Sequence, residues 1–269
     1  MMSKVVLRYS SKFILKYFHL TRWRKLYVSD SEANELYRKN HLLAALPTEE
    51  YQRLLPHLEV VSLSHRQILH EINEIIEYIY FPTQALVSMV SLMEDGATLE
   101  VGVIGRDGIV GLPVCWGGGS ATTQAIVQIP GSAIRITADR LKAEFDRHGV
   151  LYRLILLYTQ ALFTQVAQTA ACNSRHTVEQ RLARWLLSIE DRIESEQLLL
   201  TQEFIAQMLG IRRSGVTVAA TALQQAGMIR YSRGKIAIVD RQLLQSTACE
   251  CYKVVKNEFD RLIRLTHNI

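Results

Sequence analysis

The stretch that decides the fold runs from Thr201 to Val216 and reads TQEFIAQMLGIRRSGV. Thr201 is a residue type that caps helices, and Glu203 stands in the first turn, where the helix dipole favours an acidic side chain. Three apolar residues follow at helical spacing and are expected to be buried together: Ile205, Met208 and Leu209. Because glycine readily ends a helix, Gly210 predicts a tight turn, after which a second helix begins at about Arg212.

The second helix is expected to bury one face and expose the other. Its apolar face consists of Val216, Ala219, Ala220 and Leu223. Its outward face carries Ser214, Thr217, Val218 and Thr221, with Arg213 at their margin. Two short strands, Ile229–Tyr231 and Lys235–Val239, flank Ser232-Arg233-Gly234 and predict a hairpin with a basic tip. Helix, turn, helix and hairpin in this order are the pattern of a winged helix-turn-helix.

This pattern predicts binding to double-stranded DNA. A helix enters the major groove when its outer side chains are small or reach base edges, and Arg213 can form a bidentate pair with guanine. Thr201 and Gln202, at a helix N-terminus, are suited to phosphate contacts. Arg233 and Lys235, at the hairpin tip, are expected to straddle the backbone. The complete set of predicted DNA contacts is Thr201, Gln202, Arg212, Arg213, Ser214, Thr217, Arg233 and Lys235.

Composition and charge agree with a two-domain globular protein. The 269 residues are 48% hydrophobic and 21% charged, which excludes a disordered or collagen-like chain. The net charge is +6 over residues 1–40, −5 over 41–174 and +4 over 175–269, so an acidic middle that avoids polyanions lies between basic ends. Apolar runs such as Leu154 to Tyr158 are far shorter than the roughly 20 residues of a membrane span. The N-terminus lacks the apolar region of a secretory signal, and the expected location is therefore the cytoplasm.

Residues 58–137 predict an antiparallel β-sandwich or barrel. Turn residues separate short runs rich in β-branched and aromatic residues, and Glu94-Asp95-Gly96 is a hairpin signal. The expected strands are Leu58–Leu63, Ile75–Phe81, Ala85–Met93, Thr98–Ile104 and Thr122–Ile129. A helix over His41–Leu55 is expected to pack against this domain.

A long helix follows, and it carries two apolar stripes. One stripe has coiled-coil spacing and is expected to form a seam between two subunits: Val150, Leu154, Leu157 and Ala161. The adjacent stripe is expected to pack on the β-domain: Leu151, Ile155, Tyr158 and Leu162. The alternative is a helix buried within one domain. A further helix is expected over Thr177–Ile193.

Residues from about His41 to Asp240 resemble the Crp/Fnr superfamily of bacterial transcription regulators. Thr201–Val216 is similar to the family pattern T-x-x-x-[IL]-[AG]-x-x-[LIV]-G-x-[ST]-R-x-[ST]-V, in which Arg213 falls on the base-reading arginine. The resemblance implies an α+β fold with a cyclic-nucleotide-binding-type β-roll, a long dimerisation helix and a C-terminal winged helix-turn-helix. It also implies a homodimer that works with RNA polymerase. The domains would be a basic extension (1–40), the β-roll sensor (41–148), the dimerisation helix (149–174) and the DNA-binding domain (175–269).

The chain departs from the family pattern in both halves. Arg212, Ser214 and Gly215 replace residues usual in the recognition helix, so the operator sequence does not carry over. Members that bind cyclic nucleotides use a Gly-Glu pair and an arginine around the phosphate, whereas Gly111-Leu112-Pro113 lacks the glutamate and the arginine position falls at about Ala121-Thr122. Cyclic nucleotide binding in the usual mode is therefore not expected. An iron-sulfur cluster of the family's kind needs N-terminal cysteines, and none precedes Cys115. The cofactor and the sensed signal stay open.

The remaining candidates carry weaker signals. The four cysteines are too few and too scattered for a disulfide framework or a zinc knuckle, and His65 and His70 have no third ligand nearby, so no metal site is expected. Cys249 and Cys251 are either a redox pair or ordinary helix residues, and the second interpretation is favoured because alternate residues on a helix point apart. Trp116 is either a lid over a ligand or a loop anchor.

The leading hypothesis is a dimeric transcription regulator, which is not an enzyme. The rival hypothesis is a ligand-binding or enzymatic β-roll with the winged helix as a protein-interaction module. No nucleophile, base and orienting group stand together in the sequence, which disfavours an enzyme. A regulator controlled by abundance alone is a further possibility.

Overall fold

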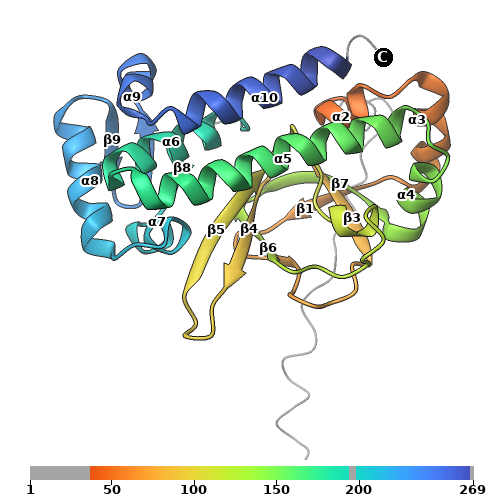
Figure 1. Ribbon diagram of the computed structural model, residues 1–269, viewed down its shortest axis with the longest axis horizontal. Helices are drawn as coiled ribbons and strands as arrows, with labels where there is room; N and C mark the ends of the chain where they lie inside the picture. The colour runs from red at the N-terminus through yellow and green to blue at the C-terminus, as the bar shows by residue number, and fades with distance from the viewer. Residues whose placement is uncertain (1–36, 194–197, 267–269) are drawn as a thin grey trace, which may run out of the picture.

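The computed structural model describes residues 37–193 and 198–266 of the chain. Residues 1–36, which make up most of the predicted basic extension (1–40), therefore lie outside the described residues. The described chain forms a β-roll, one long helix beside it and a C-terminal helical domain with a small sheet (Figure 1). The predicted fold class, α+β with a β-roll, a long helix and a winged helix-turn-helix, is confirmed.

The β-roll consists of two antiparallel sheets that pack face to face. One sheet has the order β1-β7-β3 and the other β2-β6-β4-β5. The strands are β1 (Glu59–Leu63), β2 (Ile68–His70), β3 (Tyr78–Pro82), β4 (Leu86–Leu92), β5 (Thr98–Ile104), β6 (Gln124–Ile129) and β7 (Gly131–Thr137). Small and branched side chains from both sheets share one core, among them Val61, Val87, Val127 and Ala133. At the predicted hairpin between β4 and β5, Asp95 accepts from the Ala97 amide at 2.9 Å and Gly96 adopts a φ of +81°.

Two of these strands were not predicted from the sequence. β2 is only three residues long, and β7 follows β6 after the single residue Pro130. The close approach of the two chain segments explains the glycine that opens β7, because a Cβ on Gly131 would lie 2.7 Å from the Ala85 amide nitrogen.

The predicted helix over His41–Leu55 is wrong as a single element. It is divided into α2 (His41–Ala44) and α3 (Thr48–Leu54), followed by the 3-10 turn η1 (Leu55–His57), because Pro47 cannot continue a helix. The buried Asn40 side chain caps α2 and donates to the Pro82 and Gly108 carbonyls at 3.0 and 2.9 Å. These hydrogen bonds fasten the helical start of the domain to the β-roll.

Helix α5 (Val150–Arg175) is the long helix, and it follows α4 (Ala138–Phe145). The Glu50 carboxylate accepts from the Val150 and Leu151 amides at 2.7 and 2.9 Å, which caps the helix from α3. Within the described residues, α5 is the one helix long and apolar enough to cross a membrane, with a mean hydropathy of 1.3 in its most apolar window. A core helix of a soluble protein passes the same test, and one face of α5 is buried on the β-roll and on α10 (Cys251–Thr266) (Figure 1).

The C-terminal domain contains five helices within the described residues and a three-stranded sheet. The helices are α6 (Val178–Glu190), α7 (Gln202–Leu209), α8 (Arg213–Gln225), α9 (Arg241–Thr247) and α10. The sheet has the order β8-β10-β9, from β8 (Leu198–Leu199), β9 (Ile229–Ser232) and β10 (Lys235–Ile238). The predicted helices and hairpin are confirmed here, and β8 was not foreseen. Helix α10 returns along α5, so the C-terminal domain lies against the β-roll and the long helix (Figure 1).

Candidate nucleic-acid interface

The first helix of the predicted helix-turn-helix begins and ends where the sequence indicates. The Thr201 hydroxyl accepts from the Phe204 amide at 3.2 Å, which confirms the predicted cap. Gly210 adopts a left-handed φ of +60° and ends α7. Arg212 is extended and precedes α8. The predicted apolar stripe of α7 is buried: Ile205, Met208 and Leu209.

Helix α8 buries the predicted face and exposes the other. The buried residues are Val216, Ala219, Ala220 and Leu223. The exposed residues on the opposite side are Arg213, Ser214, Thr217, Val218 and Thr221. The Thr217 hydroxyl donates to the Gln202 side chain at 3.0 Å, so the outer face of α8 is joined to the start of α7. The outer face of α8 is therefore a strip of mostly polar side chains that also includes the apolar Val218, whose side chain is 64% exposed.

The wing is held beside the start of α7. Lys235 in β10 pairs with Ser232 on one side and with Leu199 of β8 on the other. The Leu200 amide donates to the Gly234 carbonyl at 2.8 Å, and Gly234 lies so close to Thr201 that a Cβ there would be 3.6 Å from the threonine methyl group. The eight predicted DNA contacts therefore lie on α7, α8 and the wing, and all are exposed except the half-buried Gln202.

Two of the four residues predicted for the subunit seam are fully buried within one chain. Leu154 and Ala161 have no exposed surface, because the β-roll and α10 cover that side of α5. Val150 and Leu157 are half-buried against the same core. The seam assignment is therefore corrected for Leu154 and Ala161, and for Val150 and Leu157 it stays a prediction. Among the described residues, the opposite face of α5 is left exposed, and it carries Arg153, Leu156, Phe163 and Ala167. Gln160 is also exposed there, and its side chain forms a hydrogen bond with Glu258 of α10.

The β-roll encloses a small cavity of about 70 Å³ next to α5. Its described lining is mostly apolar, and His70 is the one ionisable side chain in it; burial lowers the pKa of this histidine. Leu112 and Ala121, which stand at or next to the positions that the family resemblance assigns to the glutamate and the arginine of the phosphate site, both line this cavity. Leu162 of α5 completes the wall. Trp116, which is 55% exposed, donates to the Thr159 hydroxyl of α5 at 3.4 Å, so it joins the cavity rim to the long helix.

Two buried polar contacts join the β-roll to α6 and the turn after it: Glu100 with Trp185, and Asp107 with Arg192. The Trp185 indole donates to Glu100 Oε1 at 2.7 Å, and the Ser88 hydroxyl donates to Oε2 at 2.6 Å. Burial raises the pKa of the Glu100 carboxyl to about 7, although both hydrogen bonds lower it. Arg192, in the turn that follows α6, forms an ion pair with Asp107 at 2.9 Å, with side chains only 5% and 11% exposed.

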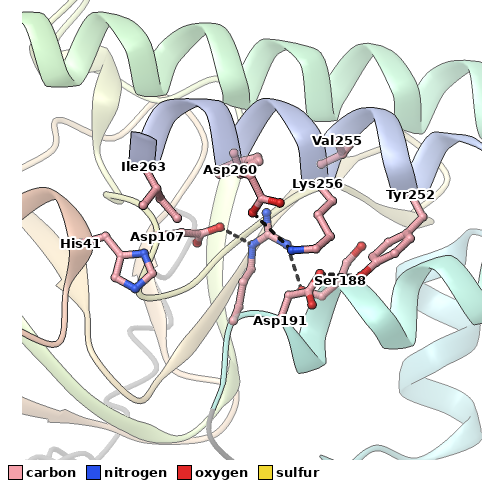
Figure 2. A pocket seen from close by; sticks show the side chains of 11 residues that line it. His41, Asp107, Ser188, Asp191, Tyr252, Val255, Lys256, Asp260 and Ile263 are labelled. Atoms are coloured by element: carbon pink, nitrogen blue, oxygen red, sulfur yellow. Dashed lines mark hydrogen bonds and ion pairs between the residues drawn. The ribbon is translucent and has the colours of Figure 1, made fainter. Parts of the chain in front are cut away.

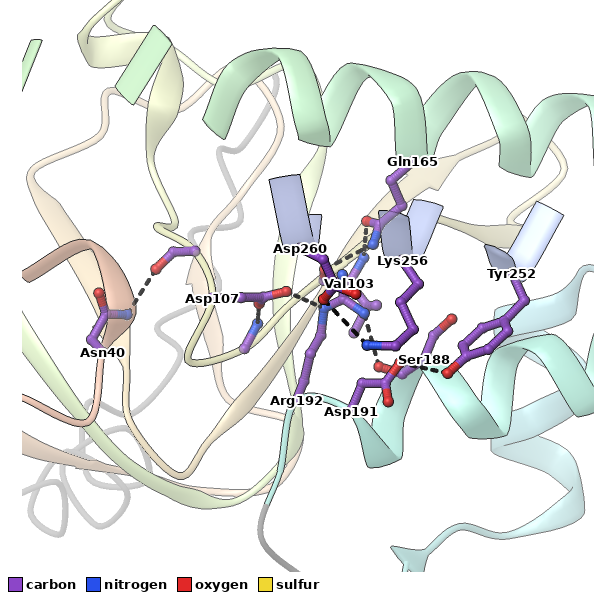
Figure 3. A network of polar contacts seen from close by, with 12 residues as sticks. Asn40, Val103, Asp107, Gln165, Ser188, Asp191, Arg192, Tyr252, Lys256 and Asp260 are labelled. Carbon is purple, nitrogen blue, oxygen red and sulfur yellow. Dashed lines mark hydrogen bonds and ion pairs between the residues drawn. The ribbon is translucent and has the colours of Figure 1, made fainter. Parts of the chain in front are cut away.

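A second cavity, of about 90 Å³, lies around this ion pair between the β-roll, α6 and α10 (Figure 2). Figure 3 shows Arg192 between Asp107 and the residues of α10. The same figure shows Gln165 of α5, whose side-chain oxygen accepts a hydrogen bond from the Val103 amide at 2.9 Å. The C-terminal domain and the β-roll therefore share buried polar contacts.

The sequence interpretation missed one cluster of side chains. Cys172, His176, Cys249 and Cys251 have ligand atoms that all lie within 4.8 Å of one another. The expectation that Cys249 and Cys251 point apart on one helix is wrong, because Cys249 lies in the link between α9 and α10 and only Cys251 is helical. The spacings Cys-x3-His and Cys-x-Cys were the available signal, but 72 residues separate the two pairs.

A β-roll, a long linking helix and a winged helix-turn-helix with an exposed second helix define a class of two-domain DNA-binding regulators. Residues 180–247 match the Crp-like helix-turn-helix domain. The predicted resemblance to the Crp/Fnr superfamily is thereby confirmed for this domain, and solved structures of Crp/Fnr regulators share the overall fold. No curated protein matches the sequence.

Solved structures of this class share the fold at low sequence identity. FixK2 from Bradyrhizobium japonicum is 20% identical, with a TM-score of 0.62, over 71% of this chain and 98% of FixK2. The c-di-GMP responsive global regulator CLP from Xanthomonas campestris is 17% identical, with a TM-score of 0.59, over 72% of this chain and 100% of CLP. A CRP-family transcriptional regulator from Thermus thermophilus is 17% identical, with a TM-score of 0.58, over 70% of this chain and 95% of that protein.

Proposed function

We propose that this protein is a homodimeric, sequence-specific DNA-binding transcription regulator of the cytoplasm that acts together with RNA polymerase. The observation that carries the proposal is the exposed strip on α8, flanked by the start of α7 and the basic wing. The β-roll senses a signal other than a cyclic nucleotide bound in the usual mode.

The chemistry of the strip suits the major groove. Arg213 provides the donor pair that recognises guanine, and the exposed methyl groups of Val218 fit the methyl group of thymine. Ser214 and Thr217 are short enough to let α8 approach the base edges. Lys235 is placed to contact phosphate, which positions the protein without reading sequence.

The free face of α5 supports a dimer. Leu156, Gln160, Phe163 and Ala167 follow one another at spacings of four, three and four residues, which is the spacing of a coiled-coil seam. Phe163 is 72% exposed and Leu156 is 45% exposed in the single chain, so pairing this face with a second copy removes apolar surface from water. Such a dimer presents two copies of α8, and its preferred DNA site is an inverted repeat with half-sites about 34 to 36 Å apart.

The cavity in the β-roll is placed to influence this dimer. Leu162 and the Trp116 contact at Thr159 belong to the same helix that carries the proposed seam. A ligand shifts the two-state balance only if it binds one arrangement of α5 more tightly than the other. The apolar lining, without a described lysine or arginine, favours a small uncharged ligand over a cyclic phosphate.

The test is a selection of binding sites from random DNA, followed by gel-shift titration of variants. Arg213→Ala is expected to cost about 1 to 3 kcal/mol on the preferred site and much less on random DNA. Lys235→Ala is expected to weaken binding to the preferred site and to random DNA alike. It should also reduce the slope of log K against log salt by about one unit, because one phosphate contact is lost. Arg140→Ala, an exposed arginine on α4, is the control and changes neither.

If the selection from random DNA yielded no preferred sequence, the proposal would be overturned in favour of the rival hypothesis, in which the winged helix is a protein-interaction module. An unchanged ratio of specific to random affinity in Arg213→Ala would remove α8 from base reading.

A further inference from the structure

Four potential metal ligands converge where the long helix ends. Cys172 and His176 lie one helical turn apart at the end of α5, Cys249 precedes α10 and Cys251 opens it. The Cys172 and Cys249 sulfurs are 3.5 Å apart, and Cys251 Sγ lies 3.7 Å from His176 Nδ1. The three cysteines are buried, and the imidazole is largely buried, with 14% of its side chain exposed.

These separations fit the edges of a coordination tetrahedron. Zinc binds sulfur at about 2.3 Å and imidazole nitrogen at about 2.0 to 2.1 Å, so in a tetrahedron two sulfurs lie about 3.8 Å apart, and a sulfur and a nitrogen lie about 3.5 to 3.6 Å apart. The ligand atoms lie within 4.8 Å of one another, which leaves room for a single ion at their centre. A cluster of several irons holds its cysteine sulfurs further apart, because metal and sulfide lie between them.

The histidine has the second partner that metal-bound histidines usually have. Its Nδ1 faces the thiols, while its Nε2 lies 3.2 Å from a carboxylate oxygen of Glu250. A carboxylate on the outer nitrogen fixes the tautomer and the orientation of the ring, and it makes the inner nitrogen a better ligand.

The surroundings also favour the net negative charge of such a site. Three thiolates, one neutral imidazole and Zn²⁺ together carry one negative charge. Arg181 and Arg184 on α6 are buried, and the Nε of each has no hydrogen-bond partner among the described residues. Both guanidinium groups interact electrostatically with this cluster, Arg184 with Cys172 and Arg181 with Cys172 and Cys249. A buried cation is costly without a compensating charge, which the occupied site supplies.

We propose that Cys172, His176, Cys249 and Cys251 form a closed, structural zinc site with Glu250 as the carboxylate partner of the histidine. The ion joins the last turn of α5 to the link between α9 and α10. It thereby ties the short link between α5 and α6, in which His176 lies, to the start of α10. Because all four positions of the tetrahedron are filled by protein, the site stabilises structure and leaves no position for a substrate.

The first experiment measures metal in the full-length protein, purified under reducing conditions without a histidine tag. We expect one zinc per chain by mass spectrometry of the metal, and a lower Tm after chelation that added Zn²⁺ restores. Replacement of zinc by Co²⁺ is expected to give the intense visible bands of a tetrahedral ion and thiolate charge-transfer bands. This readout is independent of DNA binding, so its failure is separate from failure of the proposed function.

Variants locate the ion. Cys249→Ser and Cys251→Ser are expected to lose stoichiometric zinc and most of the charge-transfer intensity, whereas Cys115→Ser, a buried cysteine in the β-roll, keeps both. Glu250→Gln is expected to keep the site but weaken zinc binding about 10- to 100-fold. If a serine variant fails to fold, chelation of the wild-type protein still decides the question.

Wild-type protein without bound metal would overturn the proposal, as would zinc retained in both serine variants. A Cys172–Cys249 disulfide in the protein under reducing conditions, or iron in place of zinc, would also overturn it.

Discussion

The replacement of Glu100 by glutamine tests the contact between the β-roll and α6. Burial raises the pKa of this carboxyl from 4.5 to about 7, so the folded protein binds the proton more tightly than the unfolded chain does. The stability contributed by the protonated form is therefore complete below about pH 4.5 and is lost as the pH rises through 7. The difference between these two pKa values corresponds to about 3 kcal/mol.

Urea unfolding at pH 5 and pH 8 measures this contribution. Because part of the loss has already occurred at pH 5, the wild-type protein should lose about 2 to 3 kcal/mol between the two conditions relative to Glu100→Gln. The amide of the variant can still accept from Trp185 and stays neutral at both pH values. Glu94→Gln, an exposed residue in the β4–β5 hairpin, serves as the control and should follow the wild type. An equal pH dependence in wild type and Glu100→Gln would refute the assignment of a raised pKa to this carboxyl.

Two further predictions concern the dimer and the sensor. Phe163→Glu should yield a folded monomer with much weaker operator binding, because the side chain is exposed in the single chain and an unpaired charge in the seam is costly. Light scattering measures the oligomeric state and circular dichroism measures folding, and a persistent dimer would place the interface elsewhere. Cyclic AMP at millimolar concentration should change neither the Tm nor the affinity for DNA, since Leu112 and Ala121 line the cavity and no described lining residue is a lysine or arginine. A micromolar Kd measured by calorimetry, which corresponds to a binding free energy of about 8 kcal/mol, would contradict this prediction.

The helix-turn-helix domain was predictable because its signals are local. The cap at Thr201, the left-handed glycine at position 210 and the two faces of α8 are all encoded within a few residues of one another. The hairpin between β4 and β5 was predictable for the same reason, since Asp95 and Gly96 specify the turn themselves. The predicted roles of individual residues in DNA contact stay predictions until they are measured.

What the sequence determined by itself was the presence and type of most elements, and with them the fold class. Only the tertiary structure decided which side of α5 is free. Both apolar stripes of this helix have helical spacing, and the β-roll with α10 covers Leu154 and Ala161 and leaves Phe163 exposed. Tertiary structure also brought Cys172 to within 3.5 Å of Cys249, 77 residues away. Periodicity describes how residues are arranged around one element, whereas packing between distant elements determines which faces and which ligands meet.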